Sequence, residues 1–210
     1  MNKIKAILFD MDGVLIDAKD WHYEALNQAL NIFGMEINRY DYLVTYDGLP
    51  TRKKLDMLTM ERGLPKALHS FINEMKQEFT FQLGYAKCKP TFNHQYALAH
   101  LKAQGYKIAA CSNSIRKTME ILFERSSLTD YFDFYLSNED VKEPKPHPEI
   151  YSMAIEMLNL QPEECIILED NENGIKAAKL SGAHILVIND VSEVNLANIT
   201  KRISEIEAQS

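Results

Sequence analysis

Two carboxylates, Asp10 and Asp12, follow the short apolar run 4–9 and lead directly into Gly13. An unpaired carboxylate is costly to bury, so the end of an apolar strand is an unusual place for two of them. Residues i and i+2 of a strand share one face, and at the strand end these two side chains can converge on one metal ion or one substrate. This conflict between a buried strand and its charges predicts a functional site.

Chemically active side chains also follow other apolar runs of the chain. They are Ser112 and Asn113 after the run 107–111, Glu169 and Asp170 after the run 165–168, and Lys145 in a proline-rich segment. In open parallel sheets, ligands bind beyond the carboxyl ends of the strands. We therefore expect four acids, one lysine and one hydroxyl group to gather at a single edge of a sheet.

Such a cluster suits phosphoryl transfer with a magnesium ion. Clustered carboxylates repel one another unless a hard cation lies among them, and Mg²⁺ prefers oxygen ligands of the kind that Asp10, Glu169 and Asp170 supply. An aspartate can attack phosphorus, while a neighbouring acid protonates the leaving oxygen and later takes a proton from water. Ser112 and Lys145 would bind the phosphoryl oxygens and neutralise the developing charge.

The elements that must position these residues form an α/β pattern. Five continuous apolar runs predict strands that are covered on both faces: Ile4–Phe9, Lys107–Cys111, Phe134–Leu136, Cys165–Leu168 and His184–Ile188. Helical patterns lie between or beside them: Asn93–Gln104, Ser114–Arg125 with Ser112 as a helix cap, His147–Leu158 and Gly174–Leu180. This alternation predicts a Rossmann-like, doubly wound parallel sheet.

Residues 16–86 interrupt the alternation with helical patterns alone. The predicted helices are Asp17–Phe33, Thr51–Arg62 and Pro65–Phe81, and a last polar helix is expected within Ser192–Gln209. The simplest arrangement is a small helical cap domain, 16–86, inserted into a catalytic core formed by 1–15 and 87–210.

Composition excludes several other functions. The chain has 210 residues and a net charge of -7, whereas a nucleic-acid-binding domain would present a basic face. No apolar run approaches the roughly 20 residues that a membrane span needs, and the first run is too short for a signal peptide. Three cysteines without CxxC spacing indicate reduced thiols. We expect a cytoplasmic protein that interacts with neither nucleic acid nor membrane and, without a heptad pattern, a monomer.

The order of these segments resembles the haloacid dehalogenase superfamily, specifically its helical-cap phosphatases and the beta-phosphoglucomutase-like subfamily. The family motifs are present as Asp10-Met11-Asp12-Gly13-Val14, Ser112, Lys145-Pro146-His147-Pro148-Glu149-Ile150-Tyr151 and Glu169-Asp170, with Asn171 at a position that is often Ser. The resemblance implies that Asp10 is the nucleophile and Asp12 the general acid and base. It also implies that Asp10, the Asp12 backbone carbonyl and Asp170 hold the Mg²⁺ ion.

Cap residues carry two interpretations each. His22 matches a histidine that lies near the site in relatives, but its position also suits a surface histidine. Arg52 matches an arginine that faces the substrate in some relatives, or it is a solvated residue of the basic run 52–54. Lys76 is a weaker candidate. We include His22 and Arg52 among the substrate-binding residues, with Ser112, Asn113 and Lys145.

The sequence thus predicts a magnesium-dependent phosphatase that hydrolyses a small phosphate ester, such as a sugar phosphate, through an aspartyl-phosphate. A sugar-phosphate mutase of the beta-phosphoglucomutase type would use the same core, although the Ser112-Asn113 pair favours hydrolysis. A non-catalytic binding module on this fold is disfavoured because Asp10, Asp12, Lys145 and Asp170 are all present. The ester depends on cap side chains whose orientation the sequence does not fix.

Overall fold

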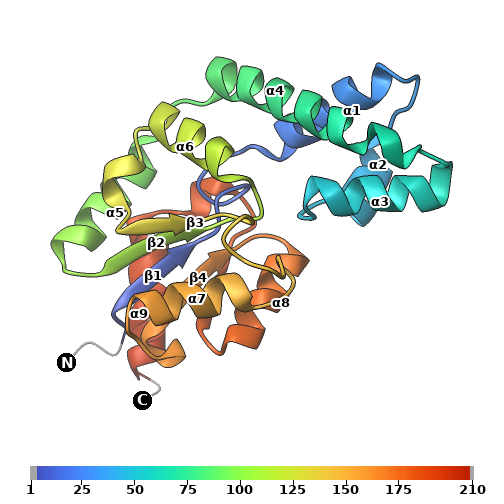
Figure 1. Ribbon diagram of the computed structural model, residues 1–210. Coiled ribbons are helices and arrows are strands. Elements are labelled where there is room, and N and C mark those ends of the chain that lie inside the picture. Colours follow the sequence, from blue (N-terminus) through green and yellow to red (C-terminus); the bar gives the residue numbers. More distant parts are fainter. Residues whose placement is uncertain (1–3, 209–210) are drawn as a thin grey trace.

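The computed structural model describes residues 4–208 and contains one five-stranded sheet (Figure 1). In chain order the strands are β1 (Ala6–Phe9), β2 (Lys107–Cys111), β3 (Phe134–Leu136), β4 (Cys165–Glu169) and β5 (His184–Val187). Their order across the sheet is β3-β2-β1-β4-β5, and every neighbouring pair is parallel. Each predicted strand is therefore confirmed to within two residues at either end.

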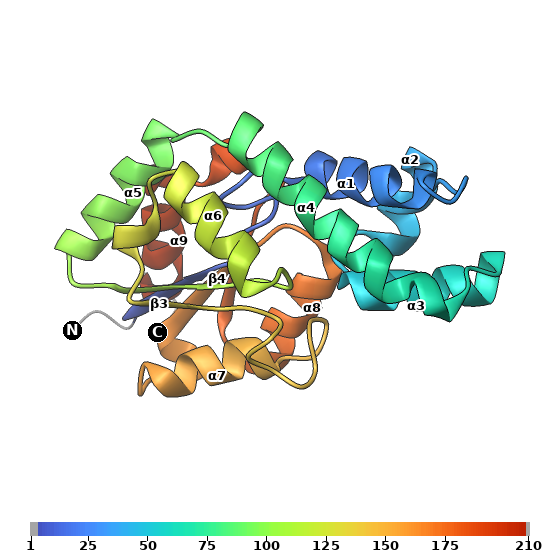
Figure 2. The ribbon, with the colours of Figure 1, turned by 45° about the horizontal axis from the view of Figure 1, so that its top comes forward.

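Helices cover both faces of the sheet (Figures 1 and 2). Ile7 and Phe9 of β1 belong to the apolar cluster that includes α5 (Phe92–Ala103), α6 (Arg116–Arg125) and α9 (Leu196–Ala208). Ala6 and Leu8 belong to a second cluster, with α7 (Glu149–Met157) and α8 (Glu172–Ser181). Alternate residues of β1 thus pack against opposite layers, which confirms the doubly wound α/β prediction.

The inserted segment is helical and has its own hydrophobic core. It contains α1 (Lys19–Asn31), α2 (Arg39–Asp41), a π-helical turn (Tyr42–Tyr46), α3 (Thr51–Arg62), a 3-10 turn (Lys66–Leu68) and α4 (His69–Lys87). Leu30, Tyr42 and Leu58 are buried together in this core. Both views show these helices beside one end of the sheet, with α4 returning to α6 (Figures 1 and 2). We refer to this segment as the cap.

Some boundaries differ from the sequence prediction. Helix α4 continues to Lys87, because it packs against α6 so closely that a Cβ at Gly84 would lie 2.9 Å from the Leu122 side chain. The helical segment Arg39–Tyr46 was not predicted. The last helix begins at Leu196, after a 3-10 turn at Val191–Glu193, and the predicted end at Gln209 lies outside the described residues.

Two further 3-10 turns, Thr129–Tyr131 and Pro162–Glu164, precede β3 and β4. The cysteines Cys88, Cys111 and Cys165 form no disulfide, in agreement with the prediction, and all three are buried. Throughout residues 4–208, no helix combines the length and apolar character that crossing a bilayer requires. The domain limits at 15/16 and 86/87 stay a prediction. Helix α4 ends at Lys87, one residue beyond the second limit.

Candidate active site

The loop after β1 places Asp10 and Asp12 at the carboxyl edge of the sheet. Gly13 follows them with a φ of +91°, a conformation that side chains other than glycine rarely adopt. A Cβ at Gly13 would lie 2.1 Å from Asp170 Oδ2, so glycine is also needed for space. The turn therefore lets the acid after β4 approach the acids after β1, as the strand order predicts.

Lys145 is the centre of the charge network in this site. Its Nζ atom lies 2.7 Å from Asp10 Oδ1 and 2.6 Å from Glu169 Oε1, and it donates to the Cys111 carbonyl and the Tyr151 hydroxyl at 2.8 Å. Burial lowers the pKa of Lys145, but the two carboxylates raise it above its ordinary value. The side chain is therefore a permanent cation that lies between two acids.

Glu169 fixes the position of that lysine. The carboxylate is fully buried, and its Oε1 also accepts a 2.5 Å hydrogen bond from the Tyr151 hydroxyl. A Cβ on Gly174, in the first turn of α8, would lie 2.0 Å from the Glu169 carboxyl group. Glycine at 174 is therefore what gives Glu169 room, a requirement that the sequence analysis missed.

The acids at this edge suit a divalent cation. Asp10, Glu169 and Asp170 each offer a carboxylate oxygen, and these oxygens lie within 4.8 Å of one another. Asp170 Oδ1 is buried without a hydrogen-bond donor among residues 4–208, whereas Lys19 Nζ lies 2.5 Å from Oδ2. The donor set and the unpartnered oxygen therefore fit a hard metal ion such as Mg²⁺.

The pKa values of these acids also favour a bound cation. Burial, followed by the charge of Glu169, raises the pKa of Asp10 well above its ordinary value. Burial likewise raises the pKa of Asp170 to about 6, although Lys19 acts to lower it. A nearby positive charge favours the ionised form of a carboxyl group, so a bound cation would lower the pKa of both Asp10 and Asp170.

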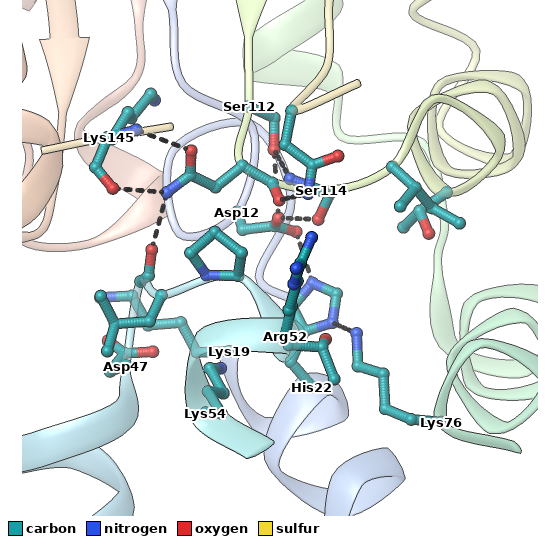
Figure 3. A pocket seen from close by; sticks show the side chains of 18 of the residues that line it. Asp12, Lys19, His22, Asp47, Arg52, Lys54, Lys76, Ser112, Ser114 and Lys145 are labelled. Atoms are coloured by element: carbon teal, nitrogen blue, oxygen red, sulfur yellow. Dashed lines mark hydrogen bonds and ion pairs between the residues drawn. The ribbon is translucent and has the colours of Figure 1, made fainter. Parts of the chain in front are cut away.

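Asp12 faces the cavity between core and cap (Figure 3). Its Oδ2 accepts hydrogen bonds from Ser114 Oγ at 2.7 Å and Ser112 Oγ at 3.4 Å, and His22 Nε2 lies 3.0 Å from Oδ1. Burial raises the pKa of Asp12, but His22 and Ser114 together lower it below its ordinary value. Asp12 is therefore a carboxylate at neutral pH when no ligand is bound.

The prediction that Ser112 caps the following helix is wrong. Helix α6 begins at Arg116, and its N-cap residue, Ile115, has no side-chain cap. Ser112 Oγ instead accepts a hydrogen bond from the Ser114 backbone N–H at 3.0 Å. This local bond forms a tight turn after β2 that directs Ser112 and Ser114 toward Asp12.

Asn113 joins the cap to the core. Its Nδ2 atom donates to the Gly48 carbonyl at 3.0 Å and to the Lys145 carbonyl at 3.2 Å, while Oδ1 accepts from the Lys145 N–H at 3.1 Å. The amide therefore has partners within the protein at both ends. Its contact with substrate stays a prediction, whereas its two hydrogen bonds to the Lys145 backbone hold the Lys145 loop in place.

Asn171, the departure from the family motif, caps α8. Its Oδ1 accepts the Gly174 backbone N–H at 3.0 Å. The same side chain lies against the cap loop, because a Cβ at Gly48 would be 2.8 Å from Asn171 Oδ1. Gly48, which has a φ of +70°, therefore lets the cap loop lie directly on the core.

The cap candidates differ in burial. His22 is not a surface histidine: its side chain is 12% exposed, and Nδ1 lies 3.2 Å from Lys76 Nζ. Burial lowers the pKa of His22; Asp12 opposes this effect and Lys76 adds to it. Arg52 is exposed, yet it lines the cavity and extends into it from α3 (Figure 3). Both predicted cap residues thus face the site.

Lys54 is a cavity residue that the sequence analysis missed. It is 6% exposed, and its Nζ atom donates to the Tyr42 hydroxyl at 2.9 Å and lies 4.6 Å from the centre of the Tyr42 ring. Burial, and then the charge of Lys76, lowers the pKa of Lys54 to about 7. A signal was present, because Lys54 precedes the buried Leu58 by one helical turn and so shares its face.

Core and cap residues line one cavity of about 1020 Å³, a volume that includes its open mouth. The core contributes the acids Asp10 and Asp12, the hydroxyl groups of Ser112 and Ser114, and Lys145. The cap contributes mainly basic and polar groups, including His22, Arg52, Lys54 and Lys76. The arrangement can bind an anionic small molecule and present it to a carboxylate nucleophile.

Comparison with known proteins is consistent with this geometry. The model of the haloacid dehalogenase-like hydrolase family matches residues 7–188. A phosphorylated carbohydrates phosphatase from Thermotoga maritima is 32% identical over 183 residues, which cover 85% of this chain and 82% of that protein. Pyrophosphatase PpaX from Bacillus mycoides is 28% identical over 195 residues, covering 89% of this chain and 84% of that protein.

The same fold occurs in a crystal structure of beta-phosphoglucomutase from Clostridium difficile. The TM-score is 0.83, and the match covers 98% of this chain and 99% of that one. At 23% sequence identity this likeness concerns the fold, including the helical segment inserted after the first strand.

Proposed function

Because this chain belongs to the haloacid dehalogenase-like hydrolase family, we propose that it is a magnesium-dependent phosphatase that hydrolyses a small phosphomonoester through an aspartyl-phosphate. The observation that carries the proposal is the shared cavity of Asp10 and Asp12, with Lys145 bonded to Asp10 and two serine hydroxyl groups bonded to Asp12. These are the groups that nucleophilic phosphoryl transfer requires, and packing alone needs none of them.

Asp10, Asp170 and the Asp12 backbone carbonyl are the proposed ligands of the metal ion. Glu169 belongs to the same cluster, but both of its oxygens already accept hydrogen bonds, from Lys145 and Tyr151 and from the Asp170 N–H. We therefore assign it mainly to the positioning of Lys145. When bound, Mg²⁺ supplies positive charge to the phosphoryl oxygens and keeps Asp10 ionised.

In the first step, a carboxylate oxygen of Asp10 forms a bond to phosphorus as the bond from phosphorus to the ester oxygen breaks. Asp12 gives its proton to the departing alcohol. Without ligand Asp12 is a carboxylate. The negative charge of a bound phosphate group raises its pKa, so Asp12 takes up a proton from solvent when the ester binds and gives a proton back when phosphate leaves. Lys145 and Ser112 stabilise the charge on the transferring oxygens.

In the second step, water forms a bond to phosphorus as the bond to Asp10 breaks. Asp12, now a carboxylate, takes the proton from that water. The two steps together consume one ester and one water and yield one alcohol and one phosphate ion, and Asp10 and Asp12 return to their starting states.

A small substrate is supported by the way the cap lies over the site. Gly48 on the cap loop is hydrogen-bonded to Asn113, and Asn173 Nδ2 contacts the Asp47 carbonyl at 3.5 Å. The cavity must open at these contacts to admit ligand and close to exclude water. The relative that is named for phosphorylated carbohydrates makes sugar phosphates the first class to test.

The proposal is tested by phosphate release from a panel of sugar phosphates, phosphoglycolate, nucleotides and an aryl phosphate, with and without Mg²⁺. We expect release that chelation abolishes and that the Asp10→Asn variant lacks, because an amide oxygen is a poor nucleophile. Silence across the panel from a protein that binds Mg²⁺ would contradict hydrolysis. Activation by a bisphosphorylated sugar would then indicate a mutase, and its absence a binding module.

A further inference from the structure

The cations that line the cavity fall into two groups. Lys145 lies 2.6 and 2.7 Å from carboxylate oxygens, and Lys19 lies 2.5 Å from Asp170. Within residues 4–208, no carboxylate oxygen lies within 4.0 Å of the ammonium groups of Lys54 and Lys76 or of the Arg52 guanidinium. Lys145 of the core and Lys19 at the start of the cap are thus neutralised by acids of the core, whereas Lys54, Lys76 and Arg52 of the cap are not.

Lys54 is the least exposed of these unpaired cap cations. The groups that contact its ammonium are the Tyr42 hydroxyl and ring, and burial keeps that phenol neutral by raising its pKa. Asp47 and Asp12 attract Lys54 through space, while Lys76 repels it. A buried ammonium without an acid partner is costly, so its placement at a cavity wall calls for an anion from outside.

We propose that the substrate carries a second anionic group, a carboxylate or another phosphoryl group, that binds Lys54 on the cap wall of the cavity. This inference rests on the proposed phosphatase activity and specifies the class of its substrate. The phosphoryl group that is transferred is already served by Lys145, Ser112 and the metal ligands of the core. Arg52 lines the same cavity and extends toward Asp12 and Ser114, so Lys54 is the cap cation that is left for the second anion (Figure 3).

A purely structural role would predict something different. If Lys54 served only to hold Tyr42 in the cap core, a neutral side chain of similar length would weaken the cap and leave substrate choice unchanged. Lys53 provides a matched control, because it is the adjacent residue of α3, carries the same charge, is exposed and does not line the cavity. Comparing Lys54→Met with Lys53→Met therefore distinguishes the effect of a charge at the cavity from the effect of the net charge of the helix.

The test uses two pairs of esters that differ in the second anion: phosphoglycolate against 2-hydroxyethyl phosphate, and fructose 1,6-bisphosphate against fructose 6-phosphate. We expect the wild type to favour the doubly anionic member of at least one pair by roughly 10–100-fold in kcat/KM, the range of one charge-assisted hydrogen bond. Lys54→Met should reduce that ratio to about 3-fold or less, and Lys53→Met should preserve it. The pair that shows the preference identifies the anion.

A binding measurement keeps the inference testable without turnover. Calorimetry with the Asp10→Asn protein should give the same preference in Kd, and Asp10→Asn/Lys54→Met should lose it while its circular dichroism spectrum stays unchanged. Equal kcat/KM or Kd within both pairs for the wild type overturns this inference, as does an equal ratio in the two lysine variants. Hydrolysis of singly anionic esters alone would leave the phosphatase proposal standing. Absence of any phosphate release would contradict that proposal instead, and the calorimetry would still decide the role of Lys54.

Discussion

The core side and the cap side of the cavity handle charge in opposite ways. On the core side, buried Lys145 lies between Asp10 and Glu169, and Tyr151 completes the set of hydrogen bonds. On the cap side, buried Lys54 has a neutral phenol as its partner and a second lysine as its repelling neighbour. Lys145 is neutralised within the protein before ligand arrives, and Lys54 is not.

This difference indicates a division of labour between the two regions. A core whose charges are fixed by one another holds a nucleophile in one geometry and can perform the same chemistry on many esters. A cap wall with unpaired cations contributes binding energy when a ligand supplies the missing charge. We infer that the core sets the reaction and the cap selects the substrate.

The largest effect is expected from breaking the core charge network with Lys145→Met. Removal of the cation leaves the Asp10 and Glu169 carboxylates buried without their counter-charge, which should cost about 3–5 kcal/mol in the free energy of unfolding. Activity should fall by about 10³-fold, because the transferring oxygens lose their fixed positive charge. Urea unfolding and steady-state kinetics measure the two effects.

Lys142→Met is the matched control for that change. Lys142 lies in the same loop and carries the same charge, but it is exposed and does not line the cavity. It should change stability and activity little, within about 0.5 kcal/mol. If Lys145→Met were as well tolerated as Lys142→Met, the core network would contribute little to stability or to catalysis.

An intermediate effect is expected where the two regions meet, at Asn113→Ala. This change removes the hydrogen bond to Gly48 on the cap and both bonds to the Lys145 backbone. At about 1 kcal/mol for each bond, kcat/KM should fall by roughly 10–100-fold. Because the cap loop is released, part of that loss should appear as a higher KM.

Asn173→Ala sharpens this result. Asn173 Nδ2 contacts the same cap loop, but at 3.5 Å from the Asp47 carbonyl, so its loss should alter kcat/KM by about 3-fold or less. Equal effects of the two substitutions would mean that Asn113 does not position the Lys145 loop.

The smallest effect is expected for the free energy of unfolding of Lys54→Met. This variant should be more stable than the wild type, whereas Lys145→Met should be less stable. The pKa of Lys54 is lowered from 10.5 to about 7 in the folded protein, so between these values the unfolded chain binds more protons. The wild type should therefore become more stable as the pH rises through this window, and the cost of Lys54 is complete below pH 7. Lys54→Met lacks this cost.

The variant should be more stable than the wild type by about 1 kcal/mol at neutral pH, after the lost contact with Tyr42 is subtracted, and the gap should close toward alkaline pH. Urea unfolding at several pH values measures this trend. A variant that is less stable at every pH would show that Lys54 holds the cap together and would remove the contrast between the two regions.

Sequence reasoning succeeded where local pattern and chemistry coincide. The apolar runs of β1 and β4 fixed the strands because both faces of the sheet are covered, and the acids that follow them had to lie at one edge. Lys145 was found because two prolines and a family motif surround it. Its pairing with Glu169 was not predicted. That pairing depends on Gly174 of α8, where any larger residue would occupy the space of the Glu169 carboxyl group.

The cap was less predictable because its site residues depend on helical phase and on loop contacts. Lys53 and Lys54 are adjacent in one basic run, yet one is exposed and the other is buried. The π-helical turn that contains Tyr42 has no distinctive sequence signal, and it provides the partner of Lys54. The substrate contact of Asn113 stays a prediction. Its hydrogen bond to Gly48 has no sequence signal, because it forms only once the cap loop lies on the core.

The most direct test of the central claim is detection of the covalent intermediate on Asp10. Wild-type protein is mixed with its best ester and Mg²⁺, quenched within a single turnover, and digested for mass spectrometry. The mechanism predicts one added phosphoryl group on the peptide that contains Asp10, and none in Asp10→Asn. Phosphate release at an unchanged rate by Asp10→Asn, or a phosphoryl group on another residue, would contradict Asp10 as the nucleophile.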